Sequence, residues 1–245
     1  MVRIGRVGGR SSGLRAASAW AALVLTLAAA SARAETAAAC RPDQIAVPPG
    51  STITFEGDSL TYGLDTTETD GLPPINRYGA KRSRVPFPEE VGRLLQGRIE
   101  VVNHGFPGDR TTDGLKRWTA EPTTALTVIL FGTNDFGNYG KLAGGPLDPE
   151  AFRRGLAELV DRRLSQGGRV LLLTPPPVGH AAPNLGLEPY RAVVREVAQA
   201  RGIAVLDTGA AMADVTPAWT DRLHLSRQAN AAIAAAVAQR ICLSP

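Results

Sequence analysis

Residues 51–60 read STITFEGDSL, a run of alternating polar and apolar residues that ends in Gly57-Asp58-Ser59-Leu60. The first six residues of this run, 51–56, predict a β-strand. Other short apolar runs recur along the chain, at residues 99–103, 125–131, 169–174 and 203–207. Because most of these runs are apolar without interruption, they indicate a sheet that is buried on both faces and is therefore parallel.

Between these runs, apolar residues recur at helical spacing. The helical stripes are Phe87/Val91/Leu94/Leu95, Phe152/Leu156/Leu159/Val160/Leu164, Tyr190/Val193/Val194/Val197 and Ala229/Ile233/Val237/Ile241. We expect Asp148 to cap the second helix, with Pro149 in its first turn, and Ser226 to cap the last helix. The alternation of strands and helices predicts a doubly wound α/β sandwich in a single domain.

The first 34 residues have the composition of a signal peptide. Arginines precede the small, apolar stretch 16–30, and Ala32-Arg33-Ala34 matches a signal-peptidase site. We expect cleavage after Ala34 and a secreted or periplasmic protein with no stable membrane insertion; an uncleaved N-terminal anchor is the alternative. The expected organisation is therefore a signal peptide (1–34), an N-terminal segment (35–50) and one domain (51–245).

The net charge of the chain depends on this leader. It holds five of the 27 Lys and Arg residues and none of the 23 Asp and Glu residues, so the remainder carries a net charge of −1. The net positive charge of the full sequence is therefore no argument for a nucleic acid or an anionic membrane as a partner. We expect a monomer.

The chain has two cysteines, Cys40 and Cys242, which lie near the two ends of the expected mature protein. An even number of cysteines in an exported protein predicts a disulfide, and chain termini often lie close together in a compact domain. Lipidation of Cys40 is the competing interpretation, although the preceding alanines lack the leucine-like residue that a lipobox prefers.

Polar residues suited to acyl transfer follow the predicted strands, at the edge where parallel sheets form active sites. Ser59 follows the first strand, Gly108 the second and Asn134 the third, and Asp221 and His224 follow the fifth. A serine hydroxyl needs a base to remove its proton, and histidine suits this role because its pKa lies near neutrality. A carboxylate three residues before the histidine can hold the other ring nitrogen.

The tetrahedral intermediate of acyl transfer also needs hydrogen-bond donors for its oxyanion. The backbone N–H groups of Ser59 and Gly108 and the side-chain amide of Asn134 are the candidates. The sequence therefore indicates a catalytic triad of Ser59, His224 and Asp221 with a three-donor oxyanion hole.

Four segments in this order resemble the conserved blocks of the GDSL/SGNH hydrolases. They are Gly57-Asp58-Ser59-Leu60, residues 101–109 with Gly108 at the oxyanion glycine, Gly132-Thr133-Asn134-Asp135, and residues 221–226. The resemblance implies the SGNH hydrolase fold, a flavodoxin-like three-layer sandwich with a five-stranded parallel sheet. It also implies ester hydrolysis without a metal or other cofactor. In the expected mature chain, no serine follows the Gly-x-Ser-x-Gly pattern of the α/β-hydrolase elbow.

Two histidines and two aspartates near the predicted site have structural roles in our interpretation. We interpret His104 and His180 as polar loop residues, because nothing around them resembles a metal-ligand motif and His104 has no carboxylate at a matching spacing. Asp58 and Asp135 adjoin the candidate site residues, and we expect them to bind backbone amides.

Two further features remain open. Trp118, Tyr139 and Trp219 are either core residues or parts of a pocket wall. The stretch 62–86 has no clear periodicity and carries Arg77, Lys81, Arg82 and Arg84, which is typical of either a solvated loop or a flap over the substrate.

The expected function is a serine esterase acting on a small-molecule or carbohydrate ester, with short acyl groups expected. A polysaccharide deacetylase or acyltransferase with the same triad is one alternative. A non-catalytic carbohydrate-binding protein is another, although a binding module has no need of all three triad residues.

Overall fold

The computed structural model describes residues 40–65, 67, 70–117, 124–137 and 145–244. All of them fall within one compact unit that spans Ala37–Pro245. The expected signal peptide, Trp118 and Tyr139 lie outside the described residues. Within the described part, no helix is long and apolar enough to cross a bilayer.

The central sheet has five strands in the order β3-β2-β4-β5-β6, and every neighbouring pair is parallel. The strands are β2 (Thr52–Gly57), β3 (Glu100–Gly105), β4 (Leu126–Leu130), β5 (Arg169–Leu173) and β6 (Ala204–Leu206). Each coincides with a predicted strand within one or two residues. The prediction of a five-stranded parallel sheet is therefore confirmed.

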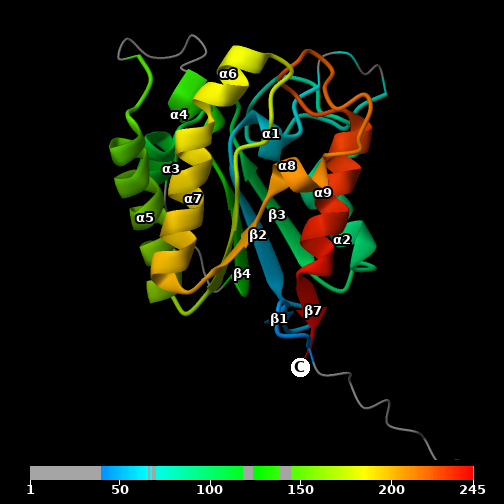
Figure 1. Cartoon of the computed structure of the whole chain (residues 1–245). Coiled ribbons are helices and arrows are strands. Elements are labelled where there is room, and N and C mark those ends of the chain that lie inside the picture. Colours follow the sequence, from blue (N-terminus) through cyan, green and yellow to red (C-terminus); the bar gives the residue numbers. More distant parts are fainter. Residues whose placement is uncertain (1–39, 66, 68–69, 118–123, 138–144, 245) are drawn as a thin grey trace, which may run out of the picture. The chain divides into compact units, whose positions relative to one another are not determined.

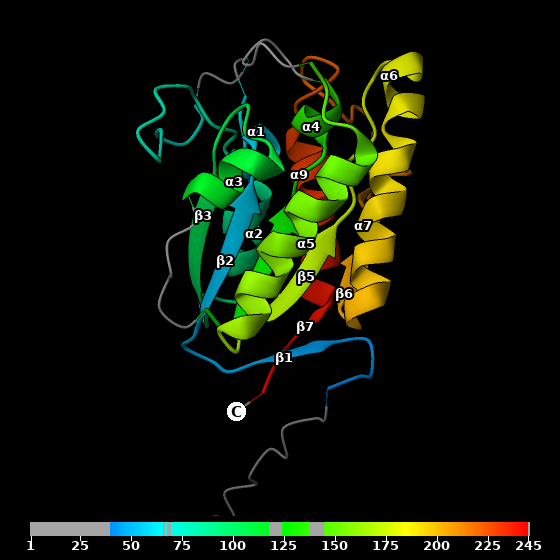
Figure 2. The same cartoon turned by 90° about the vertical axis from the view of Figure 1, so that its left-hand side faces the viewer.

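Helices cover both faces of this sheet and make three layers (Figures 1 and 2). On one face, Phe87 and Val91 of α2 (Phe87–Leu94) join Ile233 of α9 (Arg227–Gln239) in a core that contains Phe55 of β2. On the other face, side chains of three helices cover Ile129 and Leu172 of the sheet. These helices are α3 (Thr111–Arg117), α5 (Pro149–Ser165) and α7 (Glu188–Arg201).

The predicted helix caps are present. Asp148 Oδ1 accepts hydrogen bonds from the N–H groups of Glu150 and Ala151, at 3.0 and 2.9 Å, before α5 begins at Pro149. Ser226 Oγ accepts from the N–H of Ala229 at 3.1 Å before α9. Each side chain thereby satisfies amides that have no partner within the helix.

Several short elements had no signal in the periodicity. The helices α1 (Ser59–Tyr62), α4 (Thr133–Gly137), α6 (Ala181–Gly186) and α8 (Thr208–Ala211) all follow strands of the main sheet, and α1 and α4 begin within three residues of the ends of β2 and β4. Two of them carry candidate site residues, because α1 begins with Ser59 and α4 contains Asn134.

The two ends of the described chain pair with each other. The strand β1 (Ile45–Val47) lies parallel to β7 (Ile241–Leu243), and Ile45 pairs with Ile241. The assignment of Ile241 to the last helical stripe was therefore wrong, because α9 ends at Gln239. A disulfide joins Cys40 to Cys242 beside this pair of strands, with their Cα atoms 5.6 Å apart. This confirms the predicted disulfide.

Candidate active site

The nucleophile candidate lies at the turn between β2 and α1. Ser59 is the first residue of α1, and Asp58 caps this helix by accepting the N–H of Leu60 at 2.8 Å. Gly57 makes the turn possible, since a Cβ atom there would lie 2.1 Å from Thr61 Oγ1 and 2.6 Å from the Leu130 carbonyl oxygen. A tight turn thus holds Ser59 at the carboxyl edge of the sheet.

The structure brings Ser59, His224 and Asp221 together. His224 Nε2 lies 3.0 Å from Ser59 Oγ, and His224 Nδ1 lies 2.7 Å from Asp221 Oδ2. The carboxylate accepts hydrogen bonds only, so the Nδ1 atom carries the proton and Nε2 is free to accept the proton of the serine. This is the tautomer that a general base requires.

Asp221 also shapes the loop that carries the histidine. Its Oδ1 atom accepts the N–H groups of Leu223 and His224, at 3.0 and 2.7 Å. Partial burial pushes the pKa of Asp221 upward, but the hydrogen bonds from His224 outweigh this effect and hold the pKa below its usual value. Asp221 is therefore a carboxylate at neutral pH, as the partner of an imidazolium must be.

The loop after β5 supports the histidine loop. The indole N–H of Trp219 donates to the Pro177 carbonyl at 2.8 Å, and the N–H of Gly179 donates to the Arg222 carbonyl at 2.8 Å. Trp219 is also partly buried against the core cluster that contains Phe55 and Ile233, which favours the core interpretation. In turn, the buried Arg191 donates to the Pro175 carbonyl at 2.9 Å and fixes the start of this loop.

The segment after β3 forms a β-turn around Gly108. The N–H of Asp109 donates to the Phe106 carbonyl at 3.1 Å, and Gly108 has a φ of +80°. Proline at the second position and a glycine with positive φ at the third are typical of a type II turn. Among the described residues, no acceptor is found for the Gly108 N–H. The turn therefore presents an unused donor.

Arg117 of α3 contacts both ends of this turn. Its Nε donates to Asp109 Oδ2 at 3.0 Å, and its Nη2 lies 2.6 Å from the same oxygen. Its guanidinium carbon stands 3.7 Å from the centroid of the Phe106 ring, a cation–π geometry. One side chain thereby fixes the residues on either side of Pro107 and Gly108, and no pattern in the sequence predicts this arrangement.

Asn134 lies near the start of α4 and connects the other segments. Its Nδ2 donates to Asp58 Oδ2 at 3.2 Å and to the Asp109 carbonyl at 3.0 Å. All the predicted site residues thus belong to one connected network at the carboxyl edge of the sheet. Both N–H groups of the amide are engaged, so Asn134 can donate to a ligand only by giving up one of these hydrogen bonds. The longer one, to Asp58, is the easier to give up.

The comparison with protein families decides the classification. Residues 55–232 match the model of the GDSL-like lipase/acylhydrolase family, which is most of the chain. The chain belongs to this family. It is accordingly a carboxylic ester hydrolase.

Solved structures show the same fold as this GDSL-type hydrolase. A lipase/acylhydrolase from Enterococcus faecalis is 25% identical, with a TM-score of 0.61 over 77% of this chain and 94% of that one. An acetylxylan esterase from Geobacillus stearothermophilus is 24% identical, with a TM-score of 0.64 over 80% and 96%. An aryl esterase from M. smegmatis is 21% identical, with a TM-score of 0.60 over 78% and 98%. None of the curated proteins matches the sequence.

Two buried carboxylates organise the site of this GDSL-type hydrolase, as predicted for Asp58 and Asp135. Burial raises the pKa of Asp58 to about 7, despite the hydrogen bond from Leu60. Asp135 accepts from the N–H of Thr111 at 3.0 Å and from that of Gly132 at 3.1 Å. Burial raises the pKa of Asp135 to about 6. Both side chains bind backbone amides at the loops that carry Ser59, Gly108 and Asn134.

The interpretation of His104 as a loop residue was wrong. His104 lies within β3 directly opposite Glu56 of β2, and its Nδ1 is 3.3 Å from Glu56 Oε1. Glu56 is itself buried and accepts from Arg163 Nη2 at 2.7 Å. The sequence spacing hid this contact, because the two residues are neighbours across strands. His180, in contrast, is an exposed residue just before α6.

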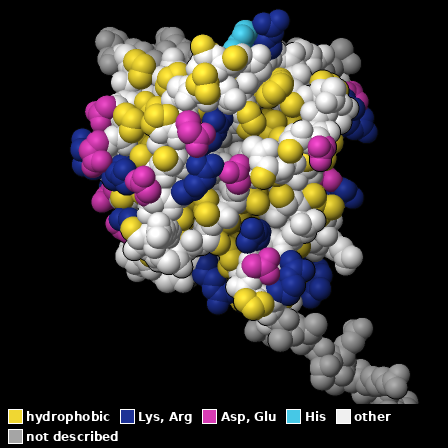
Figure 3. Space-filling model, in the orientation of Figure 1, with side chains coloured by type: hydrophobic (Ala, Val, Ile, Leu, Met, Phe, Trp, Pro, Cys, Tyr) yellow, Lys and Arg dark blue, Asp and Glu magenta, His cyan; other side chains and the backbone are white. Residues whose placement is uncertain are grey.

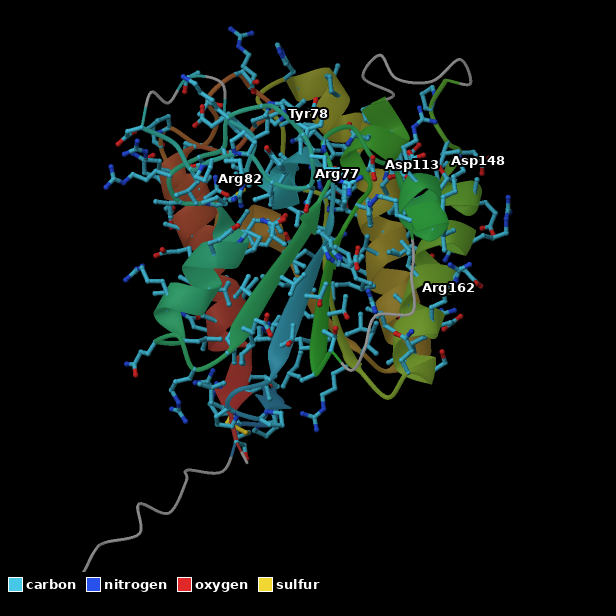
Figure 4. The ribbon with its side chains drawn as sticks, turned by 180° about the vertical axis from the view of Figure 1, so that it is seen from behind. Arg77, Tyr78, Arg82, Asp113, Asp148 and Arg162 are labelled. Atoms are coloured by element: carbon cyan, nitrogen blue, oxygen red, sulfur yellow. A yellow bond between two sulfur atoms is a disulfide. The ribbon has the colours of Figure 1, made fainter. Side chains whose placement is uncertain are left out.

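The stretch 62–86 is anchored to the domain. Arg82 is only 3% exposed, donates to the Tyr62 carbonyl at 2.8 Å and forms an ion pair with Glu89 (Figure 4). Arg82 is therefore not a solvated residue, because the Tyr62 carbonyl at the end of α1 and the Glu89 carboxylate both bind its guanidinium. Among the described residues, no group of three or more His, Cys, Asp or Glu side chains is placed to hold a metal ion.

Proposed function

We propose that the protein is a serine esterase in which Ser59 is the nucleophile, His224 the general base and acid, and Asp221 the residue that orients the histidine. The observation that carries the proposal is the 3.0 Å contact between His224 Nε2 and Ser59 Oγ, continued at 2.7 Å from His224 Nδ1 to Asp221 Oδ2. Family membership supports the ester bond as the target.

In the first half of the reaction, Ser59 Oγ attacks the ester carbonyl while its proton moves to His224 Nε2. The π electrons of the carbonyl move onto its oxygen, which becomes the oxyanion of a tetrahedral intermediate. This intermediate then collapses, and the bond between the acyl carbon and the alcohol oxygen breaks. The imidazolium returns its proton to that oxygen, so the alcohol leaves neutral. An acyl ester on Ser59 remains.

In the second half, a water molecule attacks the acyl-enzyme. His224 takes a proton from the water, and a second tetrahedral intermediate forms. Its collapse breaks the bond between the acyl carbon and Ser59 Oγ, the imidazolium returns its proton to that oxygen, and the carboxylic acid leaves. Asp221 stabilises the imidazolium in both halves without itself taking the proton.

The oxyanion hole consists of the N–H groups of Ser59 and Gly108 and the side-chain amide of Asn134. The unused N–H of the Gly108 turn supports this assignment. Asn134 joins by turning one N–H from Asp58 toward the oxyanion, which exchanges a 3.2 Å hydrogen bond for one to a full negative charge. Each such donor contributes about 3–4 kcal/mol of transition-state stabilisation.

We further propose that the protein acts outside the cytoplasm, as a secreted or periplasmic enzyme. The Cys40–Cys242 disulfide supports this location, because disulfides persist in oxidising compartments. The leader-like sequence of residues 1–34 supports it independently.

A panel of esters tests the function. The purified protein should hydrolyse 4-nitrophenyl esters, and graded acyl lengths from acetyl to decanoyl would define the acyl preference, for which we expect short chains. O-acetylated sugars in the same panel, with product analysis in the presence of acceptor sugars, separate an esterase from a deacetylase or acyltransferase. Loss of all hydrolysis in Ser59→Ala is expected, and equal activity in the two proteins would overturn the assignment.

A further inference from the structure

The loop that carries His224, residues 219–225, is held in shape by its own hydrogen bonds. The N–H of Thr220 donates to the His224 carbonyl at 2.9 Å, and the two end residues of the loop pair as an isolated β-bridge. Asp221 Oδ1 accepts the N–H of His224 at 2.7 Å. These bonds keep the imidazole next to its carboxylate, but they do not determine where it lies relative to Ser59.

Two hydrogen bonds fix this catalytic loop from outside, and both come from the segment between β5 and α6. The Trp219 indole N–H donates to the Pro177 carbonyl at 2.8 Å, at the start of the catalytic loop. The Gly179 N–H donates to the carbonyl of Arg222, the middle residue of the loop, at 2.8 Å. Apart from the contact with the nucleophile, residues 219–224 make no other hydrogen bond to the rest of the described protein.

The segment that supplies both bonds, the proline loop (residues 175–179), has little freedom to move. It reads Pro-Pro-Pro-Val-Gly, and each proline ring fixes its own φ. Arg191 of α7 is buried and donates to the Pro175 carbonyl at 2.9 Å and to the Pro176 carbonyl at 3.2 Å. Most basic side chains on the face in Figure 3 lie next to acidic ones, whereas this buried guanidinium fixes a backbone.

The proline loop also packs against the segment that leads to Asn134. A Cβ atom on Gly132 would lie 2.5 Å from Pro175 Cγ, so the two segments can meet only because residue 132 has no side chain. In Figure 1, α6, which follows the proline loop, lies at the same end of the sheet as α1 and α4. The proline loop thus connects the catalytic loop to a fixed part of the site.

Gly179 has no room for a side chain at its contact with the catalytic loop. A Cβ atom there would lie 2.9 Å from Arg222 Cβ and 3.0 Å from Arg222 Cα. Gly179 does not have a positive φ, so an alanine would fit the backbone conformation and the crowding alone would act. A side chain at position 179 would therefore displace the middle of the catalytic loop.

We propose that Trp219 and Gly179 are positioning residues, whose two hydrogen bonds hold His224 Nε2 at reacting distance from Ser59 Oγ. The inference rests on the proposed function, since it concerns the same histidine. Because Asp221 binds His224 within the catalytic loop, loss of an outside bond moves the two residues as a unit. The imidazole then keeps its carboxylate, and proton transfer with Ser59 becomes slower in both halves of the reaction.

Two substitutions test the proposal. Trp219→Phe removes the indole N–H and keeps an aromatic ring against the core. Gly179→Ala adds the Cβ atom that displaces the catalytic loop. Gly92→Ala is the matched control, because a Cβ atom there is equally crowded, at 2.8 Å from Val101 Cγ2, but lies in α2 against the amino-terminal half of β3.

Each of the two variants should lower kcat on 4-nitrophenyl acetate about 10-fold and leave KM nearly unchanged, because a displacement of about 1 Å can cost about 10²-fold in rate. Gly92→Ala should keep its kcat even where its melting temperature falls. The apparent pKa in the pH profile of kcat/KM should stay at the wild-type value, since His224 keeps its hydrogen bond to Asp221.

A double-mutant cycle separates positioning from a general structural effect. In His224→Ala, the residual hydrolysis of this activated ester comes from the oxyanion hole and binding alone, without the imidazole. Adding Trp219→Phe to that variant should therefore change kcat by less than about 2-fold, because residues that act as a unit are not additive. A residue that supports only the fold would lower kcat by the same factor in both backgrounds.

Wild-type kcat in Trp219→Phe, or in a folded Gly179→Ala, would overturn the proposal. An equal loss of kcat with and without His224 would overturn it as well. If Gly179→Ala does not fold, the cycle with Trp219→Phe decides alone. The proposed function fails by a different result, namely equal hydrolysis of the ester by the wild type and Ser59→Ala.

Discussion

His224 Nε2 lies 3.0 Å from Ser59 Oγ although 165 positions separate the two residues in the sequence. Ser59 follows the second strand of the described chain, whereas His224 belongs to the loop before the last helix. The parallel sheet brings them together because every strand delivers its following loop to the same edge. The proposed esterase mechanism depends on this contact and on the hydrogen bond from His224 to Asp221.

Replacing Asp221 with asparagine should lower kcat about 10³- to 10⁴-fold, because an amide no longer fixes the proton on Nδ1 of His224. The folded protein should persist, since the Asn side-chain oxygen can still accept the N–H groups of Leu223 and His224. Steady-state kinetics on a 4-nitrophenyl ester measure the effect. The control is Asp214→Asn, an exposed acid a few residues upstream. A loss under 10-fold in Asp221→Asn would speak against the orienting role.

Arg117→Met should lower kcat about 10-fold and leave KM nearly unchanged. The substitution removes the ion pair with Asp109 and the cation–π contact with Phe106, so the turn that presents the Gly108 N–H becomes less well fixed. A loosened oxyanion donor weakens binding of the transition state more than that of the ester. Arg154→Met, at a highly exposed position of α5, is the matched control.

The Arg117 experiment has a second readout. The affinity for a boronic acid, which forms a tetrahedral adduct with an active-site serine, should fall in parallel with kcat/KM. If KM alone rises, or if the boronate binds Arg117→Met as tightly as the wild type, the contact has no role in the oxyanion hole.

Asp58 should make the stability of the protein depend on pH. Its pKa in the folded state, about 7, is above the ordinary value of 3.8, so the folded protein retains a proton that the unfolded chain has lost. Asp58 contributes fully to the free energy of unfolding below about pH 4. As pH rises from there through about 7 this contribution is lost, and the free energy of unfolding falls by at most about 4 kcal/mol. Asp58→Asn does not show this fall, because asparagine does not titrate.

The difference in melting temperature between Asp58→Asn and the wild type is the quantity that isolates Asp58, since all other groups are shared. We expect the variant to gain on the wild type as pH rises from about 4 to about 7, and the difference to stay constant above that range. A pH-independent difference would show that Asp58 is ionised throughout.

Removing the disulfide, with Cys40→Ser and Cys242→Ser together, should lower stability by about 2–5 kcal/mol. The cross-link closes a loop of 202 residues and so limits the unfolded chain strongly. For a domain of this size, the loss corresponds to a fall in melting temperature of about 5–15 °C. Calorimetry measures the change.

The same double variant should keep its kcat and KM below its melting temperature. The disulfide lies beside β1 and β7, at the end of the sheet away from α1 (Figure 1). A large loss of kcat in the folded variant would contradict this separation of stability from catalysis.

Most of the main sheet could be predicted because parallel strands buried on both faces appear in a sequence as short apolar runs, such as residues 126–130. The long helices could also be predicted, and the caps Asp148 and Ser226 marked where two of them start. The three-residue strands β1 and β7 could not be predicted, because so short a segment has no periodicity. For the same reason Ile241 was assigned to the preceding helix.

The proposed site residues could be found because acyl transfer needs particular residue types and each followed a strand. Their supporting contacts could not. His104 meets Glu56 only through the register of β2 and β3, and Arg117 reaches Asp109 only through the placement of α3. Such contacts depend on how elements pack, which spacing along one chain does not record.

Covalent labelling of Ser59 tests the central claim most directly. The protein is incubated with a fluorophosphonate, digested, and analysed by mass spectrometry while ester hydrolysis is followed in parallel. The account predicts one adduct on Ser59, formed in proportion to the loss of activity, and no labelling of His224→Ala. An enzyme that loses activity with Ser59 unmodified, or that hydrolyses esters at the same rate after full modification of Ser59, would contradict it.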